Sequence, residues 1–334
     1  RATGGRLDLM ARPEARMPAL FGFRIPILGG VAPAFADCSV RAKAAPEILA
    51  YVAWRFRLDL AGADPKELQV PRTTLFETAL YGSIADAPRD LTAPTAELGG
   101  LRTWFDRAGI LIGRPAPDST CHLGVALKGG HNAEHHNHND VGSYVVVVRD
   151  QPVLLDPGAE TYTARTFSAR RYESKLLNSF GHPVPLVAGK LQRDGSQARA
   201  RVLETSFTDA ADRLRLDLTS AYPVPALKRL EREFVYDREG KGRLTVTDRV
   251  EFASPQTFGT ALVTLGTWRR LDDGRLRIED HKAALRVQID AGDADPVVSA
   301  ETIREDAPVT PTRIGIDLAR PAATASIRLT ITPE

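Results

Sequence analysis

Residues 128–156, KGGHNAEHHNHNDVGSYVVVVRDQPVLLD, decide how this sequence is interpreted. The whole chain has 7 histidines in 334 residues, and four of them lie within eight consecutive positions of this stretch: His131, His135, His136 and His138. The apolar runs 144–148 and 153–155 that follow are separated by a short polar turn, which predicts a β-hairpin. A dense histidine cluster joined to a hairpin indicates a built site, although a polar surface loop has the same composition.

The spacing of the histidines predicts a metal site. In an extended strand His136 and His138 point to the same face, so two imidazoles can approach one cation. Asp156 ends the second strand of the hairpin, and zinc accepts imidazole and carboxylate ligands together. With His182, which begins a further segment in NSFGHPVP, the set His138, Asp156 and His182 leaves one position for water. The alternative is a solvated loop whose histidines bind nothing.

Four longer runs resemble a known family. They are HNAEHHNHNDVGSYVVVV, PVLLDPGAETYTARTFSARRYE, NSFGHPVP and AGKLQRDG, and together they resemble the C-terminal part of heparinase II/III-like polysaccharide lyases. The resemblance is close over about 101–195 and holds by pattern beyond it. It implies an (α/α) toroid followed by an antiparallel β-sandwich, and β-elimination at a uronic acid. It also implies that His138, Asp156 and His182 form the metal triad and that His136 faces the toroid as an active-site histidine.

Elimination at a uronate requires neutralisation of the carboxylate, removal of the C5 proton and protonation of the departing O4. The segment 161–173 and the histidine cluster carry residue types suited to these tasks. We expect proton transfer from His136, Tyr162 and Tyr172, and substrate binding by His131, Arg165, Arg170 and Arg171. The alternative is that 161–173 is a solvated loop whose arginines have no role.

The metal is expected to be divalent, with zinc favoured by the donor set. Because His138, Asp156 and His182 come from three separate segments, the metal is expected to be structural and to position His136 rather than to activate water.

The charge of the chain excludes a global electrostatic attraction to polyanions. It has 44 basic and 42 acidic residues, a formal net charge of +2, so an anionic substrate must be held by local arginines. The expected partner is an acidic polysaccharide or oligosaccharide, with no nucleic acid and no membrane, and a homo-oligomer is left open. Cys38 and Cys121 fit no metal motif, no apolar run reaches the length of a membrane span, and the first five residues are not a signal peptide.

The predicted fold class is α+β: a short, partial helical toroid over 1–108 and a large antiparallel β-sandwich over 109–334. Residues 46–61 have apolar positions at helical spacing, with a proline at the start. A second helix is expected over 71–84 and a linker over 87–100. Strands are expected at 109–114, 121–128, 143–148, 199–208, 213–219, 227–236, 243–252, 256–265, 276–278 and 284–289. So many short strands without intervening helices predict a sandwich of two sheets.

The first hundred residues contain no histidine, whereas in the family the proton-transferring residues come largely from the toroid. The APAFADCS run at 32–39 resembles a family segment that follows those residues. The chain is therefore expected to be a fragment that holds the metal site and one wall of the cleft, and to be a weak lyase by itself. A secreted or periplasmic location is expected from the resemblance alone.

Two other classes of function remain open. A cupin-type metal enzyme also uses H-x-H on a β-scaffold, but it requires a nearby glutamate where this chain has Asp140 and then VGSY. A non-catalytic carbohydrate-binding sandwich would use Trp104 and Trp268 as stacking platforms. Trp54 and Trp104 are otherwise expected to be buried aromatic residues. Metal content and product analysis distinguish the three classes.

Overall fold

The structure is a computed structural model that describes residues 6–58 and 100–334. The chain divides into two compact units, 1–26 with 43–103 and 27–42 with 104–334, and we describe each by itself. The helix expected over 71–84 and, except for Gly100, the linker expected over 87–100 lie outside the described residues. The sequence division at residue 108 differs from this grouping, because 27–42 and 104–108 belong to the unit that contains the sheets.

The first unit is helical where it is described. Its elements are the 3₁₀ helix η1 (Leu9–Ala11) and the helices α1 (Pro13–Ala19), α2 (Phe21–Arg24) and α3 (Pro46–Phe56). Helix α3 confirms the expected helix after residue 46, and it ends where Arg57 adopts the left-handed conformation, with φ 52°. Leu20, Val52, Ala53 and Leu58 form its small core. No helix among the described residues is long and apolar enough to cross a membrane.

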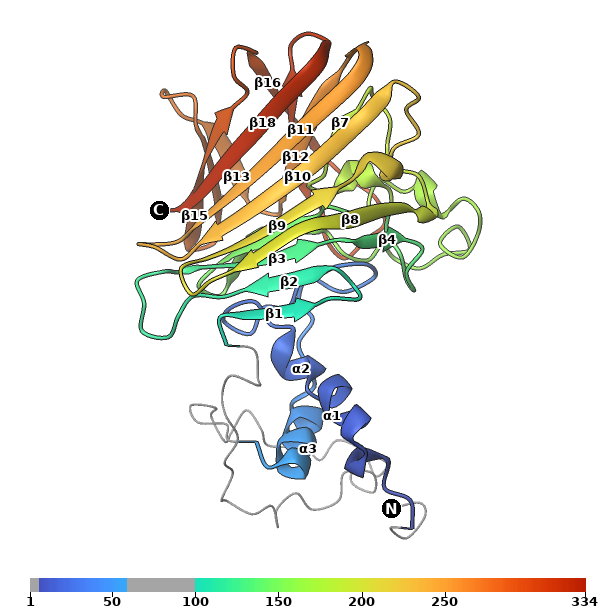
Figure 1. The fold of residues 1–334 in the computed structure, drawn as a ribbon, viewed down its shortest axis with the longest axis vertical. Coiled ribbons are helices and arrows are strands. Elements are labelled where there is room, and N and C mark those ends of the chain that lie inside the picture. The colour runs from blue at the N-terminus through green and yellow to red at the C-terminus, as the bar shows by residue number, and fades with distance from the viewer. Residues whose placement is uncertain (1–5, 59–99) are drawn as a thin grey trace. The chain divides into compact units, whose positions relative to one another are not determined.

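The second unit is an antiparallel β-sandwich (Figure 1), which confirms the predicted fold class. The long sheet has the order β13 (Thr267–Arg270), β14 (Leu276–Asp280), β15 (Ala283–Asp290), β18 (Ala322–Pro333), β11 (Arg243–Gln256), β10 (Leu227–Asp237), β9 (Ala211–Asp217), β8 (Gly195–Phe207), β4 (Gly130–Asn132). A second sheet has the order β1 (Arg102–Phe105), β2 (Ile110–Gly113), β3 (Leu123–Lys128), β5 (Tyr144–Val148), β6 (Gln151–Leu154). A third has the order β16 (Pro296–Thr302), β17 (Thr312–Leu318), β12 (Phe258–Thr264), β7 (Leu186–Val187).

The described strands therefore form three sheets rather than the expected two. All three contribute side chains to one apolar core. The two smaller sheets meet just after β6, where Leu155 N donates to Val263 O of β12 at 3.0 Å. Strand pairing stops there because the chain turns away through Asp156 and Pro157, and this break gives Asp156 a place between the sheets.

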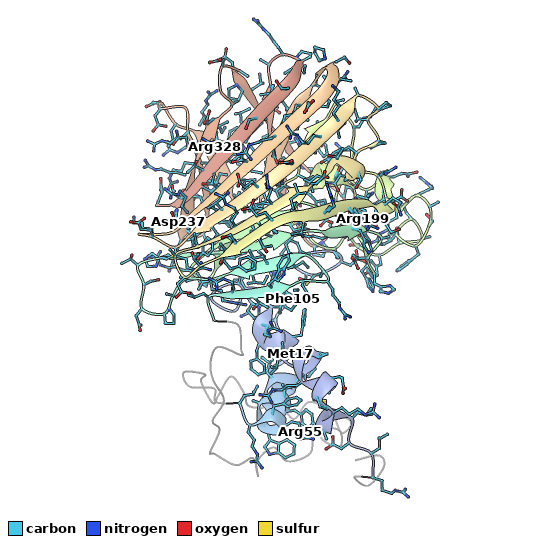
Figure 2. The ribbon with its side chains drawn as sticks, viewed as in Figure 1. Met17, Arg55, Phe105, Arg199, Asp237 and Arg328 are labelled. Carbon is cyan, nitrogen blue, oxygen red and sulfur yellow. The ribbon has the colours of Figure 1, made fainter. Side chains whose placement is uncertain are left out.

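Alternation along the long sheet separates core from solvent. On β10 the side chains of Leu230, Phe234 and Tyr236 are buried, whereas Glu231, Glu233 and Asp237 alternate with the buried positions and are only partly buried. Asp237 is labelled in Figure 2. Arg249 and Glu233 pair across neighbouring strands, at 3.1 Å. This period-two pattern is the one that predicts the strands.

The hairpin predicted after the histidine cluster is confirmed. Strand β5 pairs with β6, with Val148 opposite Gln151, and every residue of β5 is buried. The expected strand placement of His136 and His138 is wrong. Both lie in the turn between β4 and β5, and His136 has a left-handed φ of 58°. The polar side chains of this segment find partners on distant loops instead of a neighbouring strand, and this prevents an extended ladder.

Candidate metal centre and adjoining polar groove

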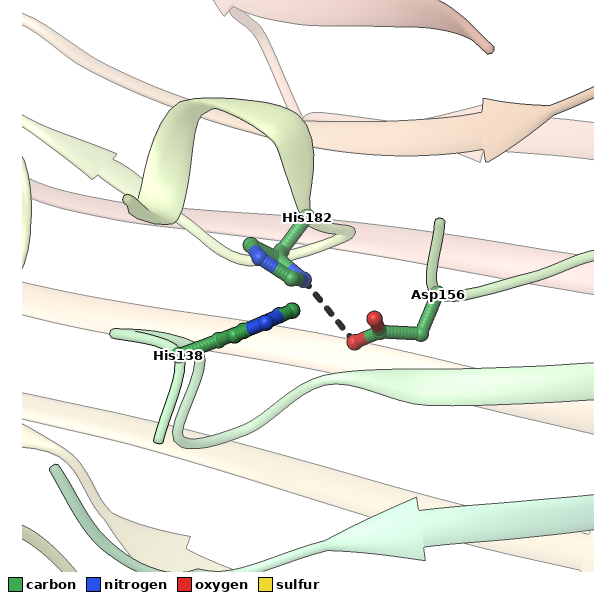
Figure 3. A group of neighbouring side chains, drawn as sticks. All are labelled: His138, Asp156 and His182. Atoms are coloured by element: carbon green, nitrogen blue, oxygen red, sulfur yellow. Dashed lines mark hydrogen bonds and ion pairs between the residues drawn. The ribbon is translucent and has the colours of Figure 1, made fainter. Parts of the chain in front are cut away.

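The structure brings together His138, Asp156 and His182, from three separate segments (Figure 3), and we call these three residues the metal-type cluster. All three side chains are completely buried. Each offers one ligand atom, and these atoms all lie within 4.8 Å of one another. His182 Nδ1 lies 2.8 Å from Asp156 Oδ2, and the two imidazole rings are 5.3 Å apart between centroids. This arrangement has the composition and spacing of a site for one divalent cation.

The surroundings of His138 test whether a cation fits. Its Nε2 lies 3.0 Å from Asp37 Oδ1, and a carboxylate can only accept, so Nε2 carries the proton. Burial lowers the pKa of His138 more than the Asp37 hydrogen bond raises it, so the ring is neutral. Its Nδ1 then has a free lone pair, is buried, and has no hydrogen-bond partner among the described residues. A cation would satisfy this atom.

His182 and Asp156 are arranged in the same manner. His182 Nε2 donates to Leu176 O at 2.9 Å, so its Nδ1 faces Asp156. Burial lowers the pKa of His182, but the charge and the hydrogen bond of Asp156 and the charge of Asp140 together outweigh it, so the pKa is raised. Burial also disfavours the charged form of Asp156 and so raises its pKa, but the charge and hydrogen bond of His182 hold that pKa below its usual range. In a metal centre, a cation would replace the proton that His182 Nδ1 and Asp156 Oδ2 share here.

Further contacts fix the orientation of Asp156. Its Oδ2 accepts from Ser143 Oγ at 3.0 Å and its Oδ1 from Gly158 N at 3.2 Å. A second carboxylate lies nearby: Asp140 Oδ2 is 3.9 Å from His182 Nδ1 and has no hydrogen-bond partner among the described residues. Its other oxygen pairs with Lys128. Lys128 therefore compensates the charge of Asp140 beside the metal-type cluster.

Asp37 is a functional candidate that sequence reasoning missed. Its carboxylate is bound by four side chains: His138, His136, Tyr162 and Arg171. Burial raises its pKa, but hydrogen bonds from His138 and Tyr162 and the charge of Arg171 hold the pKa well below the usual range. Asp37 lies about a hundred positions from the histidines, in a segment whose only sequence signal was the family-like run 32–39.

Asp37 also determines the tautomer of His136. His136 Nδ1 lies 3.0 Å from Asp37 Oδ2, and the acceptor-only carboxylate requires a proton on Nδ1. The Nε2 of the neutral ring is then available as a base. The His136 side chain is 66% exposed, in contrast to the completely buried His138. His136 and His138 thus have different environments, the first exposed to solvent and the second buried.

A shallow groove of about 480 Å³ opens beside this cluster. Its wall contains two of the predicted catalytic residues, His136 and Tyr172, together with Arg171. Tyr162 lies next to them, with its hydroxyl donating to Asp37 at 2.8 Å. Asn137, Phe167 and Asp194 also line the groove.

The predicted substrate-binding residues lie in different places in the structure. His131 does not line the groove, but its Nε2 lies 3.2 Å from Oε1 of Glu134, which does. Arg171 donates to Asp37, Asn137 O and Thr166 O, so its guanidinium is occupied by the protein. Arg165 pairs with Glu160 and Glu305, and Arg170 with Glu173. The structure does not bring Arg165 or Arg170 to the groove wall, because acidic residues close to each of them hold them elsewhere.

Comparison with solved structures identifies the fold. Heparan sulfate lyase HepC from Pedobacter heparinus matches with a TM-score of 0.65 and 14% identity, over 92% of this chain and 45% of that protein. A structure of heparinase III matches with a TM-score of 0.61 and 15% identity, over 98% of this chain and 49% of that protein. A heparinase III gene product matches with a TM-score of 0.64 and 11% identity, over 94% and 45%.

The described chain therefore has a heparinase III-like fold. It spans about half the length of the solved structures it matches. No family model and no curated protein sequence matches the chain.

Proposed function

We propose that this chain is the sandwich part of a polysaccharide lyase that cleaves a uronic acid-containing polysaccharide by β-elimination. The observation that carries the proposal is Asp37, which joins the exposed His136 and Tyr162 to the buried His138 on a heparinase III-like fold. This arrangement supports a role for His136 as a base and for Tyr162 as a hydroxyl donor, beside the groove and the metal-type cluster. A secreted or periplasmic location is part of the same proposal.

The groove supplies groups for both proton transfers. His136 Nε2 is the candidate base for the C5 proton, since Nδ1 is committed to Asp37. Tyr162 is the candidate acid for the departing O4, because its hydroxyl carries a proton and lies 3.2 Å from His136 Nδ1. Tyr172 forms part of the wall, where the Asn137 amide donates to its hydroxyl at 3.1 Å. Arg171 positions Asp37 and the histidine turn rather than clamping the substrate carboxylate.

His138, Asp156 and His182 are the proposed ligands of a divalent cation, with zinc preferred for two imidazoles and one carboxylate. When bound, the cation would tie three segments together and hold the turn that presents His136. The site is proposed as structural, because its ligands are completely buried while His136 and Tyr162 are open to solvent. No proton transfer is assigned to it.

The alternatives fit less well. A cupin-type site requires H-x-H on a strand, and here His136 and His138 lie in a turn. A stacking platform for a binding module requires exposed aromatic faces. Trp104 and Trp268 instead pack against the apolar core.

The test combines metal analysis with product analysis. We expect about one zinc per chain after purification, lost in His138→Ala together with several degrees of melting temperature. With acidic polysaccharides as substrates, we expect slow release of unsaturated uronate, detected by its ultraviolet absorbance, and loss of that signal in His136→Ala and Tyr162→Phe. Saturated products would indicate hydrolysis rather than elimination, and binding without cleavage would favour the non-catalytic module.

A further inference from the structure

Arg232 is a charged side chain in the centre of the sandwich. It projects from β10 and is completely buried. Its Nε and Nη2 donate to the two oxygens of Asp248, each at 2.7 Å, and Nη2 also donates to Thr260 Oγ1 at 2.8 Å. Its Nη1 donates to Gly142 O at 2.7 Å and to Pro183 O at 2.6 Å. A guanidinium has five N–H donors, and all five have an acceptor.

Stability alone does not explain this residue. Removing two charges from water costs several kcal/mol per ion, and an apolar pair of similar volume is often as stable or more stable. The rings of Tyr144 and Phe234 flank the guanidinium, each with its centroid 5.8 Å away. An apolar side chain would pack well against both rings. The geometry that a guanidinium imposes is therefore the better explanation for its presence.

The two carbonyls bound by Nη1 belong to the metal-type cluster's own segments. Pro183 directly follows His182. Gly142 directly precedes Ser143, whose hydroxyl donates to Asp156 Oδ2. One N–H group of Nη1 thus binds the backbone next to His182, a proposed ligand. The other binds the backbone next to Ser143, which donates to the proposed ligand Asp156. Asp248 and Thr260, on β11 and β12, hold the guanidinium in a fixed plane from two different sheets.

We propose that Arg232 is a positioning residue of the metal centre: it sets the distance between the His182 and Ser143 segments from inside the core. This inference rests on the proposed metal site and deepens it. Lysine cannot replace Arg232, because a single ammonium has three donors and cannot bind the Asp248 carboxylate in two places and both carbonyls at once. For this positioning role, the planar arrangement of the guanidinium donors is more important than the positive charge.

The test separates positioning from bulk stability. In the double variant Arg232→Met with Asp248→Leu, no charge is left unpaired, so we expect a folded protein. Its zinc affinity should fall by roughly 10- to 100-fold, the usual effect of losing a group that orients metal ligands. Hydrogen exchange should also accelerate at two amides of the affected segments, Ser143 and Val184, which donate to Asp140 O and His182 O.

The matched control is a second buried ion pair, Arg238 with Asp212. Arg238→Met with Asp212→Leu removes a comparable pair that contacts Arg114 O and Thr208 O rather than the cluster's segments. This control variant should leave the zinc affinity and the hydrogen-exchange rates of the Ser143 and Val184 amides unchanged. If the Arg232 double variant does not fold, Arg232→Lys, which retains the positive charge beside Asp248, should fold and show the same loss of zinc affinity.

Three results would overturn the assignment: unchanged zinc affinity in folded Arg232 variants, an equal loss in the Arg238 control, or unchanged amide exchange at Ser143 and Val184. A wild-type chain that binds no zinc would refute the metal part of the proposed function. In that case amide exchange alone decides whether Arg232 positions these segments.

Discussion

At the scale of single residues, the site depends on Asp37 being an acceptor only. Its two oxygens fix the protons of His136, the proposed base, and of His138, a proposed metal ligand. In Asp37→Asn the amide nitrogen faces one histidine as a donor, so one of the two tautomers is lost. We expect zinc affinity to fall roughly 10- to 100-fold and elimination to fall by roughly 10²- to 10⁴-fold.

Competition titration with a chelator measures the zinc affinity of Asp37→Asn. Asp194→Asn is the matched control, because Asp194 also lines the groove but makes no contact with His138 that the structure records. It should bind zinc as the wild type does. Asp37→Asn with wild-type zinc affinity would show that the tautomer of His138 does not depend on Asp37.

Lys128 makes a different residue-scale prediction. It is buried with Asp140, which is itself completely buried. Lys128→Met leaves a carboxylate without compensation, and we expect a loss of about 3–5 kcal/mol in the free energy of unfolding. Lys175→Met removes an exposed partner of Glu301 and should cost less than about 1 kcal/mol. Urea unfolding measures both, and equal losses would contradict the burial argument.

At the scale of elements, the loop 27–42 is held against the site through Gly158. Gly158 has a φ of 70°, and a Cβ there would lie 2.1 Å from Cys38 O. Gly158→Ala must therefore displace the loop that carries Asp37, in addition to the backbone strain. We expect an unfolding free energy lower by about 2–5 kcal/mol, from left-handed strain plus overpacking, and a weaker zinc affinity.

Gly189 is the control for Gly158, since its φ is 66° and a Cβ at this position would meet nothing within 4 Å. Gly189→Ala should show the backbone cost alone, about 1–2 kcal/mol, with unchanged zinc affinity. Thermal unfolding and zinc titration compare the two variants. Equal effects at both positions would mean that the loop adapts without disturbing Asp37.

Local patterns predict the elements better than their assembly. Helix α3 and the hairpin β5–β6 follow from apolar spacing and turn residues over a few positions. Strands β17 and β18 are absent from the predicted set, although both are regular strands in the structure. The residues His138, Asp156 and His182 are predicted as a group, and the structure brings them together. The turn conformation of His136 and the role of Asp37 depend on contacts between distant segments, which no local period encodes.

At the scale of the whole sandwich, the candidate site occupies the junction of the three sheets. Ser143 precedes β5 and Asp156 follows β6, and these two strands belong to the same small sheet. His182 precedes β7 in the other. The long sheet contributes Arg232, which binds both segments. Metal binding at this junction would couple all layers, so removal of the metal should lower the stability of the whole sandwich and not of one loop only.

The core of the sandwich also predicts its response to alkali. Burial is the main cause that raises the pKa of Tyr144, Tyr222 and Tyr236 above the usual range. In the unfolded chain each hydroxyl ionises near a pH of about 10, as in model peptides. Below that pH both states hold the proton and the tyrosines have no linkage effect. Above it the unfolded state releases protons that the folded state retains, so stability falls by about 1.4 kcal/mol per pH unit for each tyrosine.

Urea unfolding between about pH 9 and 12 measures this slope, and tyrosinate absorbance reports ionisation directly. The absorbance of the three buried residues should rise only as the protein unfolds. Tyr236→Phe should remove about one tyrosine's share of the slope. Ionisation of all tyrosines before unfolding would show that water reaches the core, and the rigid junction on which the site depends would then lack its physical basis.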